Sequence, residues 1–139
     1  MKFTFLFAFM FLFATEVIAG GVPQIRFAPQ KVISAGVMTG TATVNSTVMD
    51  LDQSYGWDCQ AVWTGTPNGA IKVQVSDDIA LSSASVTNWT DVASSSVSIT
   101  GAAGNTRWGA RPVDYRWLRL TYTNTSSTGV LNATCAVKG

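Results

Sequence analysis

Apolar and polar residues alternate with a period of two along most of the chain after Asp50, and this pattern constrains the fold more than any other. Within residues 55–63 one face of the predicted strand is apolar: Tyr55, Trp57, Cys59, Ala61 and Trp63. Residues 96–99, 115–123 and 130–137 follow the same rule. This period is typical of strands with one buried face, and no window shows the spacing of a capped helix. About seven or eight short strands between Gly, Asn and Ser turns predict a single all-β sandwich or jelly roll.

The segments 55–63 and 71–75 are joined by residues 64–69, which hold Pro-Asn-Gly, a strong turn signal. Two alternating runs on either side of a short turn predict a β-hairpin. In the second run we expect one face to point to the core and the other to solvent, with Ile71, Val73 and Val75 inward and Lys72, Gln74 and Ser76 outward.

The first nineteen residues have the composition of a secretory signal peptide. Lys2 precedes an apolar run over residues 3–14, and small side chains flank a cleavage point after Ala19. The alternative is a membrane anchor, but the apolar run is well short of the roughly 20 residues that span a bilayer. We therefore expect export, with residues 1–19 removed. We predict an extended arm over 20–34, edge strands within 37–48 (together the region 20–49), and a sandwich domain over 50–139.

The chain has two cysteines, Cys59 and Cys135. In an exported protein such a pair indicates one disulfide, and two cysteines without histidine make a poor metal site. Both cysteines fall on the apolar faces of their predicted strands. We expect the bridge to pin the two facing sheets; the alternative is a pair of buried thiols.

Several kinds of chemistry are excluded by what the sequence lacks. It has no histidine, no glutamate after Glu16, and none of the nucleophile or nucleotide-binding motifs, so we predict that it is not an enzyme. The formal net charge of +1 gives no field to attract nucleic acid. Asp50 and Asp52 could hold Ca²⁺ together with loop carbonyls, the alternative being a solvated turn.

The five tryptophans are the main functional lead. Trp57 and Trp63 share the core face with Cys59, and we expect Trp89 to close one end of the sandwich. Trp108 lies in the turn-rich segment 104–112 between two arginines, an arrangement suited to stacking against a sugar or a partner surface.

Trp117 falls on the outward face of its strand. The predicted contact residues are therefore Arg107, Trp108, Arg111, Trp117 and Arg119. The alternatives are that Trp108 folds back over the core edge, and that Trp117 is buried by the arm or by another subunit.

Five short sequence segments occur in the order seen in one group of proteins. They are residues 60–66, 71–78, 88–91, 115–120 and 129–134. In this order the chain resembles discoidin-like, galactose-binding-type jelly rolls, and in particular small jelly-roll proteins of tailed phages and bacteria. The resemblance implies a non-catalytic domain that binds glycans or surfaces, or that builds fibres. The signal peptide departs from the phage pattern, because virion parts assemble in the cytoplasm.

These observations predict a secreted or periplasmic module for surface attachment or assembly, which binds a glycan or another cell-surface partner. The alternative is a structural subunit of an extracellular fibre, filament or virion-like assembly, in which the arm adds a strand to a neighbouring copy. A homo-oligomer, as a trimer or filament, would fit either role. Four N-glycosylation sequons also occur, at Asn45, Asn88, Asn124 and Asn132.

Overall fold

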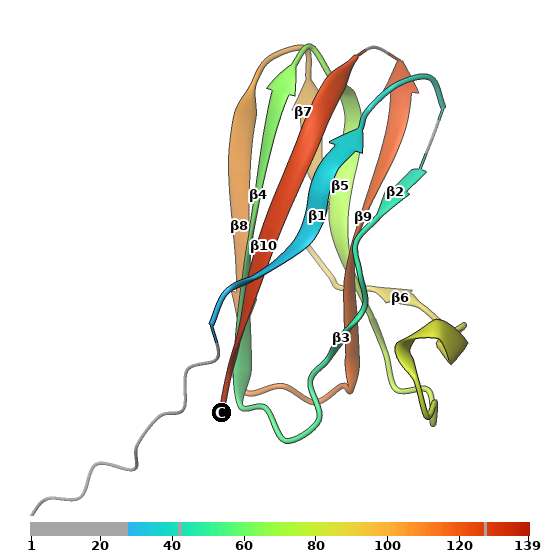
Figure 1. The fold of residues 1–139 in the computed structure, drawn as a ribbon, viewed down its shortest axis with the longest axis vertical. Helices are drawn as coiled ribbons and strands as arrows, with labels where there is room; N and C mark the ends of the chain where they lie inside the picture. Colours follow the sequence, from blue (N-terminus) through green and yellow to red (C-terminus); the bar gives the residue numbers. More distant parts are fainter. Residues whose placement is uncertain (1–27, 42, 127) are drawn as a thin grey trace, which may run out of the picture.

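A computed structural model describes residues 28–41, 43–126 and 128–139, so the predicted signal peptide lies outside the described residues. Two antiparallel sheets pack face to face, which confirms the β-sandwich (Figure 1). The helical content of the described part is a short 3₁₀ turn, η1 (Ser83–Ser85). None of the described residues form a helix long and apolar enough to cross a membrane.

The strands divide unequally between the sheets. The four-stranded sheet runs in the order β1 (Gln30–Val37), β10 (Gly129–Lys138), β4 (Gly56–Gly65) and β8 (Gly104–Ala110). The six-stranded sheet contains β2 (Thr43–Asn45), β3 (Met49–Asp50), β9 (Trp117–Ser126), β5 (Asn68–Ser76), β6 (Thr90–Asp91) and β7 (Val97–Thr100).

The pairing is nested along the chain. β1 pairs with β10, β2 and β3 pair with successive parts of β9, β4 pairs with β8, and β6 and β7 pair with β5. β2 and β3 can be counted as one interrupted strand, and β6 and β7 as another, which leaves eight strands. The first of these pairs with the eighth, the second with the seventh, the third with the sixth and the fourth with the fifth. A nested antiparallel ribbon wrapped into two sheets is a jelly roll.

The predicted hairpin between residues 55–63 and 71–75 is wrong, although both strands exist. Both edges of β4 are paired within the four-stranded sheet, so β5 continues in the other sheet. The connection is held by other loops: Thr66 N donates to Thr128 O at 2.9 Å, and Gly101 N donates to Pro67 O at 2.7 Å. Gly65 has a φ of +84°, and a Cβ there would lie 2.7 Å from Thr128 O. The Pro-Asn-Gly signal therefore marks a crossing between sheets.

The arm predicted over 20–34 is wrong for its last residues, because Gln30–Val37 is a strand of the sandwich. Val32 and Ile33 are both buried, and the register with β10 shifts on either side of Ile33. Such a bulge interrupts the period of two that marks a strand in sequence. The predicted edge strands within 37–48 are represented by β2, at the end of the six-stranded sheet.

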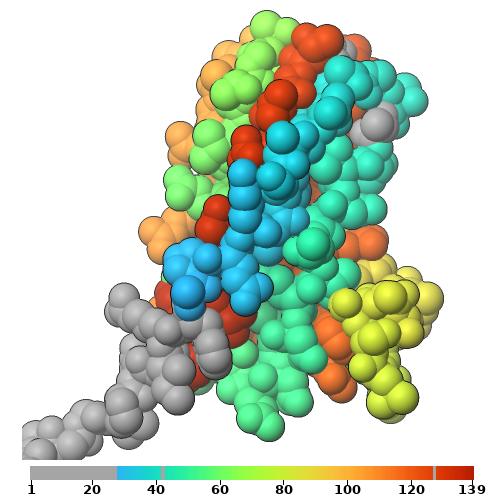
Figure 2. Space-filling model, viewed as in Figure 1, coloured from blue at the N-terminus to red at the C-terminus, as the bar shows by residue number. Residues whose placement is uncertain are grey.

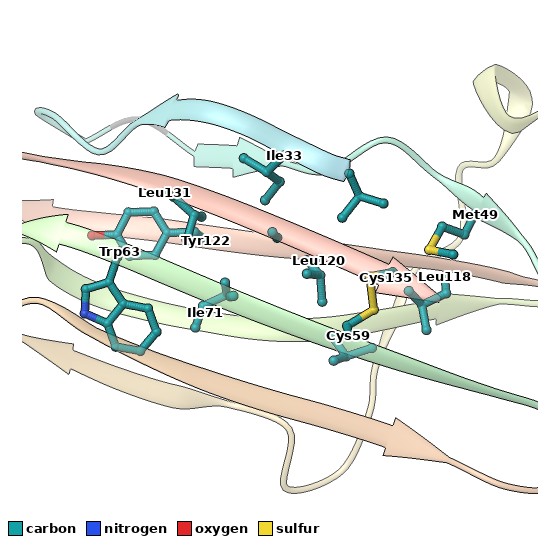
Figure 3. Packing of buried hydrophobic residues seen from close by; sticks show 14 of the residues in the cluster. Ile33, Met49, Cys59, Trp63, Ile71, Leu118, Leu120, Tyr122, Leu131 and Cys135 are labelled. Carbon is teal, nitrogen blue, oxygen red and sulfur yellow. A yellow bond between two sulfur atoms is a disulfide. The ribbon is translucent and has the colours of Figure 1, made fainter. Parts of the chain in front are cut away.

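The core lies between the sheets (Figure 3), and the predicted faces are largely confirmed. The inward residues of β4, β9 and β10 are buried: Trp57, Cys59, Ala61, Trp63, Leu118, Leu120, Tyr122, Leu131, Ala133 and Cys135. Ile71 and Val73 of β5 are also buried, but so is Ser76, which was expected to face solvent. Tyr55 precedes β4 and is 55% exposed, so its predicted place in the core is wrong.

The predicted disulfide between Cys59 and Cys135 is confirmed, but its expected role is not. The two cysteines lie directly opposite each other on β4 and β10, which are neighbours in the same sheet. The bridge therefore fastens two strands of one sheet, and the two sheets are held together by the packed core and by the loops between them.

Removal of this bridge should destabilise the fold strongly. It closes a loop with a sequence separation of 76 residues. A closed loop of that length restricts the unfolded chain by roughly 4 kcal/mol in the chain-entropy model. We expect the Cys59→Ser/Cys135→Ser variant to lose most of this free energy of unfolding in urea titrations. A loss below about 1 kcal/mol would show that the bridge hardly constrains the unfolded state.

Candidate functional site

The five tryptophans all use their indole nitrogens inside the protein. Each N–H donates to an acceptor of the same chain: Trp57 to Tyr115 Oη at 2.7 Å, Trp63 to Ala102 O at 2.9 Å, Trp89 to Val86 O at 3.3 Å, Trp108 to Ser95 O at 2.7 Å and Trp117 to Asp78 O at 3.0 Å. Trp57, Trp63 and Trp117 are at most 7% exposed. Indoles that are packed and hydrogen-bonded in this way serve the fold, so the predicted stacking role of Trp108 and Trp117 is not supported.

Trp117 does lie on the outward face of β9, as predicted, but it is only 2% exposed. It is covered by residues 77–89, the covering loop, which connects β5 to β6. Ala80 and Val86 of this loop pack on the indole, with Val48 and Trp89 at the margin. The chain's own loop therefore covers Trp117, and neither the arm nor a second subunit is needed.

Asp78, near the start of the covering loop, is hydrogen-bonded to residues near its end. Its carboxylate accepts hydrogen bonds from the backbone N–H groups of Thr87 and Asn88, at 2.7 and 2.9 Å, and from both their side chains. These bonds, chiefly those from Asn88, lower the pKa of Asp78 to about 2. The loop thus has a defined shape that depends on an ionised carboxylate.

Arg119, also a predicted contact residue, is engaged beside this loop. Its guanidinium lies 4.2 Å from the centre of the Trp89 ring, and its Nε donates to Gln74 Oε1 at 2.8 Å. Asp91 accepts from Gln74 and from Lys72, which completes a polar layer on the outer face of the six-stranded sheet. Trp89 belongs to this layer, so its predicted place at the end of the sandwich is wrong.

Asp50 and Asp52, the predicted calcium ligands, form a turn in which Asp50 already has partners. Asp50 Oδ1 accepts from Asp52 N at 2.9 Å, and Arg116 pairs with Asp50 Oδ2 at 3.2 Å. Burial opposes the ionised form, but these hydrogen bonds and the charge of Arg116 together hold the pKa of Asp50 below its ordinary value. No three metal-binding side chains gather anywhere in the part of the chain that the structure describes.

Arg107 and Arg111 lie on the other side of the molecule, beside the four-stranded sheet. The segment 104–112 was predicted as a loop, but Gly104–Ala110 is the edge strand β8. In its register Trp108 lies opposite Cys59 and packs against the core, whereas Arg107 lies opposite the exposed Gln60. Trp108 therefore folds back over the core edge, the alternative that the sequence left open, and the five predicted contact residues do not form one site.

The two arginines border a shallow hollow of about 500 Å³. We call it the cationic hollow; its charged residues are Asp58, Arg107, Arg111 and Lys138. Asp58 is paired with Lys138, and Arg107 Nη2 lies 3.4 Å from its carboxylate. Three cationic side chains thus share the hollow with one carboxylate, and the Arg107 side chain is 70% exposed. This excess of positive charge suits an anionic ligand.

Two glycines make room for these charged side chains. Gly109 lies opposite Asp58, and a Cβ at Gly109 would lie 2.4 Å from Asp58 Oδ1. A Cβ at Gly56 would lie 2.6 Å from Cγ of Arg111. Asp58, Lys138 and both glycines were missed in the sequence, because only the register of β4 with β8 and β10 brings them together.

The rest of this outer face carries short polar and aliphatic side chains. Gln60, Thr134 and Asn105 are exposed, and Val62 and Val130 are 43% and 38% exposed. The face is therefore uncovered and rich in hydrogen-bonding groups, in contrast to the outer face of the six-stranded sheet.

Among the sequons, Asn124 is only 3% exposed and its amide donates to Gly40 O at 2.6 Å, so it is not accessible in the folded chain. The Asn88 amide is hydrogen-bonded to Asp78.

No protein-family model matches the chain, and no curated protein matches it significantly. The resemblance to discoidin-like jelly rolls of phages and bacteria therefore stays a prediction, and the functional argument depends on the two outer faces.

Acid should loosen the covering loop through Asp78. Because its pKa of about 2 is below the ordinary value of 3.8, Asp78 stabilises the fold above about pH 4, and this contribution is lost as the pH falls through 2. We expect Asp78→Asn to be less stable than the wild type at pH 7, with a difference that shrinks towards pH 2. Denaturant midpoints at pH 7, 4 and 2 measure this.

The matched control is Ser83→Ala, an exposed change in the same loop. A difference between Asp78→Asn and the wild type that stays constant from pH 7 to pH 2 would contradict the role of the carboxylate. Faster hydrogen exchange over residues 77–89 in Asp78→Asn would locate the effect in the loop.

Proposed function

We propose that the protein is a secreted, non-catalytic module that attaches to anionic glycans of a cell surface through the cationic hollow. The observation that carries this proposal is that Arg107 and Arg111 border one hollow together with Lys138 and Asp58. Guanidinium groups donate paired hydrogen bonds that match the oxygens of carboxylate and sulfate groups. A disulfide between the only two cysteines supports a role in an oxidising compartment.

The architecture of the hollow favours a ligand that lies along the surface. It is open and shallow, on the outer side of β8 and β4, and it continues into the uncovered face with Gln60 and Asn105. Amide and hydroxyl side chains in such rows suit the hydroxyl groups of a polysaccharide. Trp57 and Trp108 also line the hollow, but both indole nitrogens already donate within the protein, so recognition here relies on charge and hydrogen bonds from other side chains.

Binding to polyanions should therefore depend on the two arginines and on salt. We expect Arg107→Gln/Arg111→Gln to weaken binding to heparin or hyaluronan by roughly 10- to 100-fold, since each charged hydrogen bond contributes about 1.5–3 kcal/mol before losses to screening. Calorimetry at 50 and 150 mM salt measures the change, with neutral dextran as the uncharged comparison.

The matched control is Lys72→Gln/Arg116→Gln, which removes the same charge from the side of the six-stranded sheet. If both double variants lose affinity equally, binding reflects net charge and the hollow is not the site. If the wild type binds neither polysaccharide, the proposed ligand class is wrong.

The structural-subunit alternative receives support from a different observation. Residues 30–37 are paired with β10 in their own sheet, so this part of the chain is not a detached arm, and residues 20–27 of the predicted arm lie outside the described residues. However, the covering loop exposes two aliphatic side chains completely.

A further inference from the structure

Asp58 lies at the centre of the cationic hollow, on the outer face of β4. Its two neighbours on the same row of the sheet are Gly109 on β8 and Ala136 on β10, which have no side chain or a short one. In Figure 2 the three strands lie towards the left of the molecule, with β10 in red, β4 in green and β8 in orange. This row therefore leaves the carboxylate open to side chains that reach in from the neighbouring rows.

The cationic side chains come from the rows on either side of this carboxylate. Arg107 starts one row away, opposite Gln60, and Lys138 starts one row away in the other direction, opposite Gly56. Arg111 lies over the same glycine, because a Cβ at Gly56 would lie 2.6 Å from the Cγ of Arg111. The register of three strands therefore places one carboxylate between cations that start on both sides of it.

The Asp58 carboxylate is an anion that the protein itself supplies to the hollow. Its Oδ2 accepts a hydrogen bond from Lys138 Nζ and lies 3.4 Å from Arg107 Nη2. The side chains of Asp58 and Lys138 are only 25% and 18% exposed, whereas that of Arg107 is 70% exposed. The lysine charge is therefore paired within the protein, and the arginines supply the donors that face outward.

A small anion in the centre of the hollow would compete with this carboxylate. Neighbouring strands lie about 5 Å apart, so an anion seated over Gly109 would be about that far from Asp58. Two like charges at this separation repel each other, and the repulsion is stronger where the protein displaces water.

A chain of anions can avoid this repulsion. Arg107 and Arg111 are four residues apart along the edge of the sheet, which corresponds to roughly 13 Å of extended chain. A polyanion can place one acidic group at each guanidinium from the outside and leave the centre of the hollow to Asp58.

We propose that Asp58 makes the cationic hollow selective: it excludes single small anions such as sulfate, and it admits polyanions whose acidic groups are spaced along a chain. This selectivity rests on the proposed function, because it belongs to the same hollow, and it narrows the ligand class from anions in general to extended polyanions. A repulsive element built into a site is a common source of specificity. Asp58 is then a specificity-determining residue that need not contact the polysaccharide.

The first test is binding of inorganic sulfate to the mature protein, followed by NMR at the backbone amide of Gly109, with sodium chloride at equal ionic strength as the blank. We expect Asp58→Asn to bind sulfate roughly tenfold or more tightly than the wild type, because the amide has nearly the same shape but no charge. The matched control, Asp91→Asn, removes a carboxylate paired with Lys72 on the other sheet, and it should bind sulfate like the wild type. An unchanged affinity in Asp58→Asn, or an equal gain in the control, would overturn the proposal.

A second variant separates the position of the carboxylate from the net charge of the hollow. Asp58→Asn/Lys138→Gln removes one charge of each sign, so the net charge is that of the wild type and Lys138 is not left without its partner. We expect this variant to bind sulfate roughly threefold or more tightly than the wild type. Equal affinities would mean that net charge alone controls sulfate binding. Circular dichroism of each variant confirms that the sandwich is intact.

Heparin binding by the same variants distinguishes a failure of this selectivity from a failure of the proposed function. We expect Asp58→Asn to gain less affinity for heparin than for sulfate, since the polyanion already avoids the carboxylate; a larger gain for heparin would contradict the selectivity. If heparin binding depends on Arg107 and Arg111 but Asp58→Asn gains no sulfate affinity, only the role of Asp58 is wrong. If heparin binding does not depend on the two arginines, the proposed function is wrong, and the selectivity fails with it.

Discussion

The register between β4 and β10 is the constraint on which the rest of this structure depends. The two strands pair over their whole length in the middle of the four-stranded sheet, and Cys59 and Cys135 bond directly across the pair. A shift of one residue would turn every side chain to the opposite face. The same register that buries the cysteines puts Asp58 and Lys138 on the outside, where they meet. The core and the cationic hollow are thus two faces of one alignment, and the disulfide fixes both.

The two outer faces of the sandwich differ in whether a loop of the chain covers them. The outer face of the six-stranded sheet carries Trp117, too large and apolar to leave in water, and the covering loop buries it with help from Asp78 and Trp89. The outer face of the four-stranded sheet carries Gln60, Asn105, Thr134 and short aliphatic side chains, which need no cover. The aromatic and charged groups of the first face are therefore engaged in contacts within the protein, whereas Arg107 and Arg111 on the second face are exposed. The loop that covers the first face carries Ile79 and Leu81, the most exposed large apolar side chains of the described residues.

Sequence alone could predict which face of each strand is buried. An apolar–polar alternation with a period of two identifies the inward-facing residues, whichever strand lies next to them. This is why the faces of β4, β9 and β10 and the sandwich itself could be inferred, whereas the disulfide follows from the single pair of cysteines and the expected export. Which strands pair with each other could not be predicted in this way. A Pro-Asn-Gly signal marks a reversal of the chain, but it does not indicate whether the next strand stays in the same sheet. β1 was missed because a bulge breaks its alternation, and β8 because Gly104 and Gly109 resemble turn residues. The prediction of the contact residues was wrong for a related reason. Trp117 was correctly placed on the outward face of β9, but the loop that covers this face has no periodic pattern in the sequence.

The nested pairing also determines when the molecule can form. β10 lies between β1 and β4, both of which precede it in the chain, so the four-stranded sheet has no central strand pair until residues 129–138 are present. A chain emerging from a ribosome or a translocation channel would expose unpaired edges of β1 and β4 throughout synthesis, and such non-local pairings form slowly. Cys135 lies on this closing strand, so the disulfide cannot form before the strand that completes the sheet is available.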